Sequence, residues 1–457
     1  MKSYKLSQKN KKVHFIGIGG VNMSGLAKHL IAQGFAVSGS DICTNNLAEL
    51  KSLGITVYDG HSQKNLQNVD VVIYTSAVSE DNPELKFARE NNIAILKRSE
   101  LLGQIMDEYK ISVAISGSHG KTTTTDMIAN MLINANLSPT VFLGGEDKNF
   151  GNYISGTGDI IIAEACEYQR NFLDLHPKIA IVLNIDNDHL DTYKDIEQTI
   201  KAFCEFSKNS ISIINVDDKM TKRICNISTI SFAKNGIANY TAKKVWYNGK
   251  GYSFTVYSSG RRLGRIRLNI AGEHNVYNAL SVVAVGELLK VPFNKIKTSL
   301  ENFLGVKRRN EFVGKVFGMD VFCDYAHHPK EILAMLLSYE KENKDFITIF
   351  QPHTYSRTRL LINEFIDCFN NCSPLIIYKT YPARETFDEL GSAKTLYQQL
   401  NKHQNGKDKK IYYANDEKEL EILLKACSEV YKKAVFLGAG DIYDVAKQIV
   451  SKKGDIC

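Results

Sequence analysis

The chain has 457 residues, of which 44% are hydrophobic and 23% charged, and its formal net charge is +7. This length and composition predict two or three globular domains and exclude a disordered chain. The small charge and the scattered basic residues argue against a nucleic-acid-binding protein. Without an apolar run of roughly 18 residues or a secretion signal, we expect a cytoplasmic protein with no membrane insertion. The nine cysteines lack metal-ligand spacing and are expected to be reduced thiols.

The first hundred residues alternate predicted strands and helices. A strand is predicted over Val13–Ile18, a helix over Ser24–Gln33 and a second strand over Ala36–Ser40, which together make a βαβ unit. The alternation continues to Asp107, and we expect a first domain over residues 1–108. This pattern predicts an α/β fold of the Rossmann-like type for the N-terminal domain.

A glycine turn joins the first predicted strand to the first predicted helix. It contains Gly17, Gly19 and Gly20, and Asp41 ends the following strand. In this geometry backbone N–H groups at a helix N-terminus bind the diphosphate of a nucleotide. Asn22 stands where the strict dinucleotide pattern has its third glycine. The turn alone is compatible with a nicotinamide cofactor, with another nucleotide such as a UDP-linked ligand, or with tight packing only.

The second domain is expected over residues 109–304 and begins with a strand at Ile111–Ser116. A glycine-rich loop follows this strand and leads into a helix that extends through Leu132. In such a P-loop the backbone N–H groups face a phosphate, a lysine reaches the terminal phosphates and a threonine hydroxyl binds magnesium. Ile115 stands where the eight-residue pattern has its first glycine, so the match is to the shorter GxxGKT form. The predicted phosphate-binding residues are Gly117, Ser118, His119, Gly120, Lys121, Thr122 and Thr123.

Two further predicted strands of this domain end in polar residues. Glu164 ends one apolar strand, and a cluster over residues 184–191, which contains His189, follows another. The carboxyl ends of parallel strands meet at one edge of the sheet, where the phosphate loop also lies. Magnesium prefers oxygen ligands that it shares with ATP phosphates, so Glu164 and Thr122 are candidate ligands and His189 is a softer one. The alternative for each residue is a helix cap or a solvated turn.

The later part of the chain contains a hairpin and then a third α/β domain. The apolar period is two from Ala238 to Ile270, and residues 247–251 predict a hairpin turn within a peripheral antiparallel sheet. A helix is predicted over Val276–Leu289. Phe303–Gly305 precedes a basic cluster and is interpreted as the hinge into a Rossmann-like C-terminal domain, residues 305–457. The predicted strands of that domain are Val321–Tyr325, Phe346–Phe350, Leu375–Lys379 and Ala434–Gly438.

Histidines and arginines gather at two predicted strand ends of the third domain. Asp324–Pro329 closes the first strand and Gln351–Arg359 closes the next. Two strand ends rich in these residues predict a pocket for anions and carboxylates. The alternative is a capped helix start at the histidine pair, and zinc is disfavoured because no cysteine ligand accompanies the histidines. The candidate residues are His327, His328, Arg357 and Arg359.

Together these motifs, in their order and spacing, resemble the Mur ligase family over essentially the whole chain. Any one of them could arise by chance, whereas the complete series in order could not. The segments that carry the resemblance are residues 17–25, 117–123, 164–168, 184–191, 272–278, 307–309, 324–329 and 351–359.

The resemblance implies a role for each domain: the first binds a UDP-sugar, the second binds ATP and magnesium, and the third closes over both with the amino acid. It implies that Lys121 contacts the terminal phosphates and that Thr122, Glu164 and His189 surround magnesium. His274, Asn275 and Asn278 would face the adenosine, and Arg309 and Asp324 would reach the nucleotide. The residues implied on the amino-acid and sugar side are His327, His328, Arg357, Arg359, Gly17, Gly19, Gly20 and Asp41.

The resemblance further implies an ATP-dependent ligase of peptidoglycan precursor synthesis that joins L-alanine to the carboxylate of UDP-N-acetylmuramate through an acyl phosphate. Attack by the amine needs a base, for which His327 or His328 is a candidate. Related ligases that add later amino acids carry a carbamylated lysine where Phe203 aligns here, which favours the alanine-adding member. The alternatives are a recycling ligase that joins a peptide to the same sugar, a nicotinamide-dependent oxidoreductase and a non-catalytic nucleotide-binding regulator. We expect a monomer or a weak homodimer.

Overall fold

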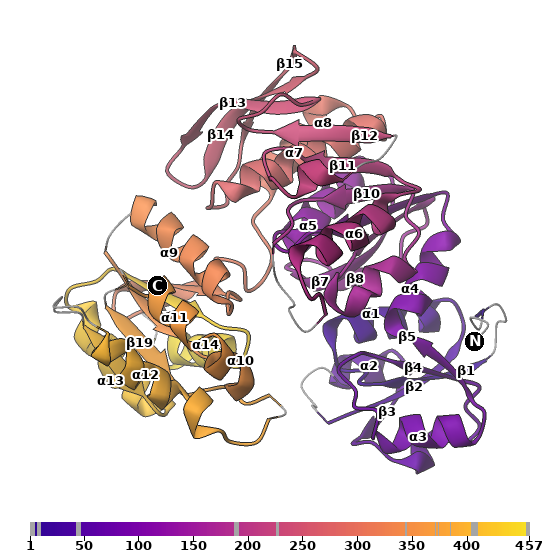
Figure 1. Cartoon of the computed structure of the whole chain (residues 1–457), viewed down its shortest axis with the longest axis horizontal. Coiled ribbons are helices and arrows are strands. Elements are labelled where there is room, and N and C mark those ends of the chain that lie inside the picture. The colour runs from indigo at the N-terminus through magenta and orange to yellow at the C-terminus, as the bar shows by residue number, and fades with distance from the viewer. Residues whose placement is uncertain are drawn as a thin grey trace. The chain divides into compact units, whose positions relative to one another are not determined.

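The chain folds into two compact units, Met1–Leu304 and Gly305–Cys457 (Figure 1). Among the described residues, no helix is long and apolar enough to cross a membrane. The division of the first unit at residue 108 stays a prediction. The computed structural model describes residues 5–6, 11–42, 47–186, 192–224, 228–342, 345–370, 372, 374–383, 385–403 and 410–453.

The first unit begins with a sheet of five parallel strands in the order β3-β2-β1-β4-β5. This order confirms the Rossmann-like prediction, and the apolar strand residues are buried because helices cover the sheet. The sequence placed the strand and helix starts within a few residues. The strands are β1 (Lys12–Ile16), β2 (Ala36–Asp41), β3 (Thr56–Asp59), β4 (Val71–Tyr74) and β5 (Ala94–Lys97). The helices are α1 (Val21–Ala32), α2 (Leu47–Ser52), α3 (Pro83–Glu90) and α4 (Arg98–Asp107).

A second sheet of ten strands follows, in the order β15-β14-β13-β12-β11-β10-β6-β9-β7-β8. Its parallel centre places the ends of β6, β9 and β10 at the same edge. The strands are β6 (Ile111–Ser116), β7 (Thr140–Asp147), β8 (Gly151–Ile154), β9 (Ile160–Glu164), β10 (Ile179–Val182), β11 (Ile211–Asn215), β12 (Thr229–Ala233), β13 (Tyr240–Tyr247), β14 (Tyr252–Ser258) and β15 (Arg261–Arg267).

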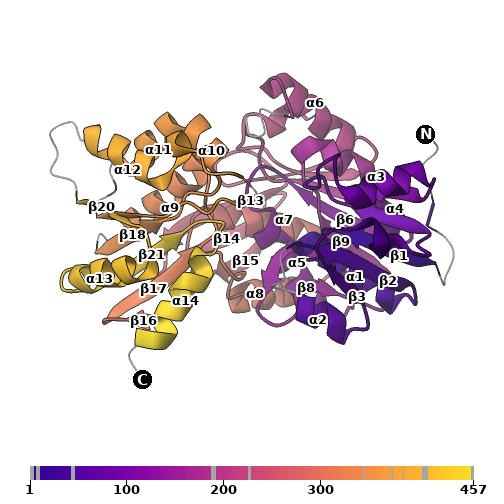
Figure 2. The same cartoon turned by 90° about the horizontal axis from the view of Figure 1, so that it is seen from below.

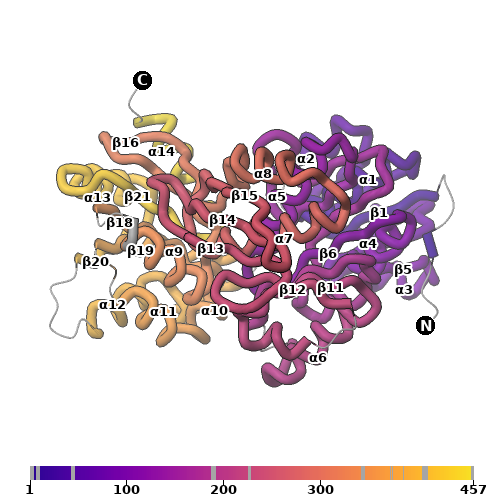
Figure 3. The backbone as a smooth tube through the Cα atoms, turned by 90° about the horizontal axis from the view of Figure 1, so that it is seen from above, coloured from indigo at the N-terminus to yellow at the C-terminus, as the bar shows by residue number. Residues whose placement is uncertain are grey.

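The predicted hairpin is present, and its antiparallel strands lie at the edge of the ten-stranded sheet. Strands β13 and β14 are antiparallel, and the turn between them occupies the predicted residues. Phe232 of β12 pairs in parallel with Tyr240 of β13, so the hairpin extends the edge of the central sheet. Figure 3 shows β13 and β14 next to helix α7 (His274–Leu288), which packs against them.

Helices connect the two sheets of the first unit into one core. The apolar cluster around Val13 and Phe15 of β1 continues to Ile161 and Ala163 of β9. Helix α1 packs on β7 and β8, and Figure 2 shows it beside β8. The other helices of this unit are α5 (Lys121–Asn134), α6 (Ile196–Ser207) and α8 (Phe293–Asn302), with a 3₁₀ segment η2 at Tyr168–Asp174.

The second unit contains a six-stranded sheet in the order β16-β17-β21-β18-β19-β20. Only β16, which the sequence analysis missed, runs antiparallel to its neighbour among the described pairings. The unit has two apolar clusters among the described residues. Ile349 of β18 belongs to one and its neighbour Phe350 to the other, because successive side chains of a strand point to opposite faces of the sheet. The strands are β16 (Glu311–Val316), β17 (Met319–Asp324), β18 (Phe346–Phe350), β19 (Leu375–Tyr378), β20 (Ile411–Ala414) and β21 (Lys433–Leu437). The helices are α9 (Pro329–Glu342), α10 (Tyr355–Leu360), α11 (Ile362–Cys368), α12 (Ala393–Lys402), α13 (Glu417–Ser428) and α14 (Ile442–Lys453).

Candidate active site

The predicted phosphate loop lies between the end of β6 and the start of α5. Gly117 and Gly120 have φ values of +136° and +87°, which side-chain-bearing residues rarely adopt. A Cβ atom on Gly120 would also lie 2.9 Å from Oδ1 of Asn278 on α7. Gly120 is the N-cap of α5 and supplies no side-chain cap. The first turn of α5 therefore presents backbone N–H groups of the kind that bind a phosphate.

Asn184, which follows β10, fixes the shape of this loop. Its Oδ1 accepts a hydrogen bond from the His119 N–H at 2.8 Å, and its Nδ2 donates to the His119 carbonyl at 3.0 Å. The Ser118 hydroxyl accepts from the N–H of Asp186 at 2.8 Å. Two strands far apart in the sequence thus hold the loop in one conformation.

Lys121 lies folded over its own loop. Its Nζ donates to the Gly117 carbonyl at 2.5 Å and lies 3.1 Å and 3.2 Å from the two carboxylate oxygens of Glu167. Burial alone would lower the pKa of Lys121, but the charge and hydrogen bond of Glu167 together with the charges of Cys166 and Glu164 outweigh it, so the pKa is raised. The lysine is therefore charged at neutral pH, with Glu167 as its ion-pair partner.

Glu164 and Thr122 meet at the start of α5. The Thr122 hydroxyl donates to Oε2 of Glu164 at 3.1 Å, and the N–H of Gly144 in β7 donates to Oε1 at 2.6 Å. Among the described residues no group of three histidine, cysteine or carboxylate side chains could hold a metal. Magnesium does not need one, because it binds through one or two protein oxygens together with phosphates and water. The oxygens of Thr122 and Glu164 fit a magnesium ion. The third predicted ligand, His189, lies outside the described residues.

The first turn of α7 approaches the phosphate loop from the other side. Asn278 donates through Nδ2 to Oδ1 of Asn275 at 3.0 Å, and Asn275 donates to the Ala271 carbonyl at 2.6 Å. Both side chains are buried. A Cβ atom on Gly272 would meet the ring of His274, which begins this helix. The structure thus brings the predicted adenosine-side residues to one helix turn next to Gly120.

The glycine turn after β1 is held by the end of β2. Gly17 has a φ of +82°, and its N–H donates to the Ser40 carbonyl at 2.8 Å. The Gly19 N–H donates to the Asp41 carboxylate at 2.8 Å, and Gly20 is an N-cap of α1 without a side-chain cap. Asp41 therefore shapes the turn itself, and the N-terminus of α1 stays available for an anion.

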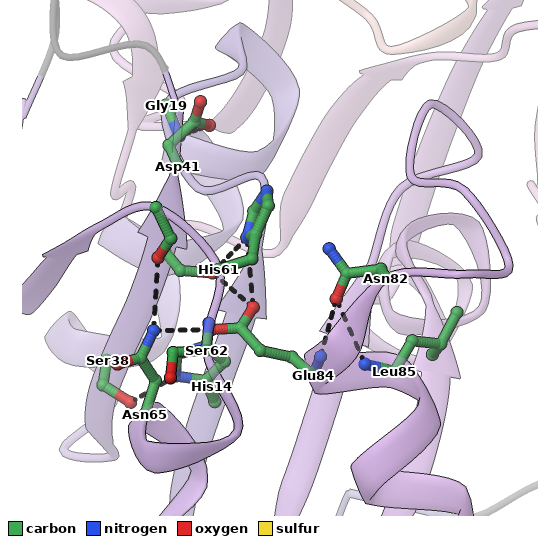
Figure 4. A network of polar contacts seen from close by, with 12 residues as sticks. His14, Gly19, Ser38, Asp41, His61, Ser62, Asn65, Asn82, Glu84 and Leu85 are labelled. Atoms are coloured by element: carbon green, nitrogen blue, oxygen red, sulfur yellow. Dashed lines mark hydrogen bonds and ion pairs between the residues drawn. The ribbon is translucent and has the colours of Figure 1, made fainter.

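A buried carboxylate lies below this turn, as Figure 4 shows. Glu84 of α3 accepts from the Ser40 hydroxyl at 2.5 Å, from Asn65 Nδ2 at 2.7 Å and from His61 Nδ1 at 3.1 Å. Nε2 of His14 lies 3.5 Å from the same carboxylate. Burial would raise the pKa of Glu84, but these donors lower it well below its usual range. The sequence analysis assigned no role to this network.

In the second unit, Asp324 and the arginines before β16 lie together. The Asp324 carboxylate accepts from the N–H groups of Asn310 at 2.7 Å and Ala326 at 2.8 Å. Burial raises its pKa, although Arg309 and the two N–H groups act in the opposite direction. The guanidinium of Arg309 lies over the ring of Tyr325 at 5.3 Å. Asn310 adopts a φ of +45° and accepts a hydrogen bond from the Tyr339 hydroxyl.

The ends of β17 and β18 bring two histidines and an arginine together. The rings of His327 and His353 are 5.7 Å apart, and Arg357 Nη1 lies 3.3 Å from Nδ1 of His353. Burial lowers the pKa of both His327 and His353 to about 4, so both rings are neutral at pH 7. A neutral imidazole can accept a proton, and Arg357 can bind an anion.

Two predicted residues of this region stand apart from that cluster. His328 lies at the start of α9, where its Nδ1 accepts from the Lys330 N–H at 3.4 Å. Arg359 is exposed and lies 3.4 Å from Asp388. The alternative interpretation of the histidine pair as a capped helix start is therefore favoured for His328, and His327 is the one that joins the cluster.

Comparison with known proteins places these features in one family. Residues 12–110 match the model described as Mur ligase family, catalytic domain, and residues 115–286 match the Mur ligase middle domain. The UDP-N-acetylmuramate–L-alanine ligase of Clostridium acetobutylicum is 41% identical over 461 residues, covering 97% of this chain and 98% of that protein. The chain belongs to the Mur ligase family. The enzyme of the same name from Clostridium beijerinckii is 44% identical over 85% of this chain and 88% of its own length.

Solved structures of family members have the same fold. The crystal structure of UDP-N-acetylmuramate-alanine ligase from Thermotoga maritima superposes with a TM-score of 0.82 at 30% identity, covering 96% of this chain and 98% of that one. A murein peptide ligase from Psychrobacter arcticus matches with a TM-score of 0.71 at 20% identity, covering 98% of this chain and 100% of that one. At that identity the second match shows the fold alone.

For a Mur ligase, the structure also adds residues that sequence reasoning missed. Glu167 is the ion-pair partner of Lys121, and it lies in the segment 164–168, which carried the resemblance without a role for this residue. His353 lies inside a motif of which only the two arginines, Arg357 and Arg359, had been assigned. Phe203, which the sequence analysis aligned with the carbamylated lysine of related ligases, is fully buried with its ring 5.0 Å from that of Phe172, so it makes an apolar core contact.

Proposed function

We propose that this protein is an ATP-dependent ligase that joins L-alanine to the lactyl carboxylate of UDP-N-acetylmuramate, a step of peptidoglycan precursor synthesis. The observation that carries the proposal is the position of the charged Lys121, which folds over the phosphate loop. The residue after it, Thr122, donates a hydrogen bond to Glu164. Relatives that are 40–44% identical bear the name of this ligase, which favours it over the recycling alternative. ATP is a cytoplasmic metabolite, so we assign the reaction to the cytoplasm.

The chemistry requires activation because a carboxylate is a poor electrophile with a poor leaving group. In the first step a lactyl carboxylate oxygen attacks the terminal phosphorus of ATP, forming an acyl phosphate as the bond to ADP breaks. In the second step the alanine nitrogen attacks the acyl carbon, phosphate leaves with that carboxylate oxygen, and the nitrogen loses a proton. One ATP and two substrates thus give ADP, phosphate and the amide.

The residues of the first unit supply charge and alignment for the first step. The attack brings several negative charges together, and Lys121 stands where it neutralises the charge on the transferred phosphoryl group. Thr122 and Glu164 would hold magnesium, which when bound neutralises phosphate charge and orients the terminal phosphate. Asn278 and Gly120 fix the adenosine side of the same loop.

The second unit supplies groups for the second step. His327 is neutral at pH 7 and accepts the proton from the alanine nitrogen, a role for which His328 is less suited because its Nδ1 already accepts a backbone hydrogen bond. Arg357 binds the alanine carboxylate. Replacement of His327 by Ala should lower kcat while ATP binding is retained.

Phosphate release tests the proposal. The protein is supplied with ATP, magnesium and UDP-N-acetylmuramate together with L-alanine, glycine, L-serine or a tripeptide, each beside a control without the sugar. Release that requires both the sugar and L-alanine is expected. Release with the tripeptide alone would instead identify the recycling ligase, and release without the sugar would contradict the proposal.

A lysine variant tests the assignment of the phosphate loop. Lys121→Met keeps the length of the side chain and removes its charge, and it should lower the rate of phosphate release by about 100-fold or more. Lys148→Met is the matched control, because Lys148 is exposed and its Nζ donates to the Leu304 carbonyl at 3.3 Å. Wild-type turnover by Lys121→Met would overturn the assignment.

A further inference from the structure

Asn152 of β8 holds the first turn of helix α1. Its Nδ2 donates to the Val21 carbonyl at 2.5 Å and to the Ser24 hydroxyl at 2.9 Å. Its Oδ1 accepts from Nζ of Lys28, one turn further along the helix, at 3.0 Å. The side chain is only 6% exposed, and every one of its polar atoms is paired. An amide that is satisfied on both sides of a buried seam fixes the position of the helix it contacts.

The surface of α1 around this contact is built for close approach. Ser24 and Gly25 are small, buried residues of α1. Nδ2 of Asn152 lies 3.6 Å from the position of a Cβ atom on Gly25, and the His29 ring donates to or accepts from the Tyr153 hydroxyl at 3.0 Å. The contact therefore extends over two turns of the helix and is centred on the amide.

The same strand is in register with the strand that carries Glu164. Tyr153 of β8 pairs with Phe142 of β7, and Phe142 pairs with Ala163 of β9. The pairing of β7 with β8 is irregular between Phe142 and Asp147, so the aligned row across the three strands is the one that contains Tyr153 on β8 and Ala163 on β9. Strands in a sheet are about 4.8 Å apart, so these two residues, which neighbour Asn152 and Glu164 in the sequence, occupy positions roughly 10 Å apart.

We propose that Asn152 is a positioning residue that sets the distance between the UDP-sugar and the phosphate loop. The inference rests on the proposed function, in which the N-terminus of α1 receives the diphosphate of the UDP-sugar. Asn152 fixes that helix end to the ten-stranded sheet. In this sheet β9 ends at Glu164, and β6 leads into the loop that precedes Lys121. The lactyl carboxylate is thereby held at attacking distance from the terminal phosphate, where a misplacement of about 1 Å can cost a factor of 100 in rate.

The test is Asn152→Leu, which keeps a similar side-chain volume and removes all three hydrogen bonds. We expect kcat/KM for UDP-N-acetylmuramate to fall about tenfold or more, while the Kd for ATP measured calorimetrically without the sugar changes less than twofold. Gly25→Ala is the matched control on the same seam, because its added Cβ makes only ordinary contacts, and it should behave as wild type. Ser24→Ala removes one hydrogen-bond partner of Asn152 and should lower kcat/KM for UDP-N-acetylmuramate by about threefold. This variant provides the test if Asn152→Leu does not fold.

Three results would separate the possibilities. Wild-type protein that shows no alanine-dependent phosphate release would refute the proposed function rather than the role of Asn152. If wild type is active and both Asn152→Leu and Ser24→Ala retain its kinetics, the role of Asn152 is refuted. Equal losses of sugar and ATP binding accompanied by a lower melting temperature would also refute it, because they indicate a purely structural contact.

Discussion

Asp126, buried one turn and a half into α5, should weaken the fold at neutral pH. Its side chain is fully buried, Oδ1 accepts from Asn130 Nδ2 at 2.9 Å, and Oδ2 has no hydrogen-bond partner among the described residues. Burial, followed by the charge of Asp147, raises its pKa to about 9. The carboxyl is therefore protonated at pH 7 in the folded protein and ionised in the unfolded chain.

The magnitude follows from the difference between the two pKa values. An unfolded aspartate has a pKa of about 3.9, and each unit of difference corresponds to about 1.36 kcal/mol. Between pH 3.9 and about 9 the folded state binds one more proton, so the free energy of unfolding falls by up to about 1.4 kcal/mol per pH unit from this group. At pH 7 the accumulated cost is up to about 4 kcal/mol.

The perturbation is Asp126→Asn, which keeps the shape and the acceptor for Asn130 and carries no charge at any pH. Urea unfolding of both proteins at pH 6, 7 and 8 can be followed by the fluorescence of Trp246, the only tryptophan in the chain, which lies in the same sheet as the strands around α5. The variant should be more stable, and its advantage should grow by roughly 1 kcal/mol per pH unit. An advantage that stays constant across this range would refute the reasoning.

Three further outcomes are expected. Glu84→Gln should reduce the loss of stability below about pH 4.3. The lowered pKa of Glu84 means that its carboxylate stabilises the fold above the unfolded pKa, and this contribution disappears as acid protonates the group. Acid unfolding curves of variant and wild type measure the difference. Phe203→Ala should lower the free energy of unfolding by about 3–5 kcal/mol in urea titrations, since the ring is fully buried, whereas exposed Phe387→Ala should have little effect. Gly103→Ala should lower the melting temperature by several degrees, because its Cβ would collide with the Asp174 carbonyl oxygen of η2, and an unchanged melting temperature would contradict the packing.

The parts of the fold that local sequence determines were predicted well. The strand Ile111–Ser116 was placed correctly because an apolar run ends at a glycine, and a glycine-rich loop before a helix has few other interpretations. Phe346–Phe350 was equally clear. Gly117 and Gly120 do adopt the left-handed conformation that a phosphate loop requires. In each case neighbours within a few residues carry the information.

The parts that depend on distant contacts could not be predicted in the same way. The hairpin β13–β14 was found, but its pairing with β12 depends on a tertiary register and not on the period of its residues. The Glu84 network joins residues up to 70 positions apart. Arg359 failed to join its predicted neighbours because a helix turns it toward Asp388.

The most direct test of the account follows the oxygen atoms of the lactyl carboxylate. UDP-N-acetylmuramate labelled with ¹⁸O in that carboxylate is incubated with ATP, magnesium, L-alanine and the protein, and phosphate and product are analysed by mass spectrometry. The account predicts one ¹⁸O atom in each released phosphate and an amide product that retains the other. Amide formation with unlabelled phosphate would contradict the acyl-phosphate route, and phosphate release without an amide of L-alanine would contradict the assigned function.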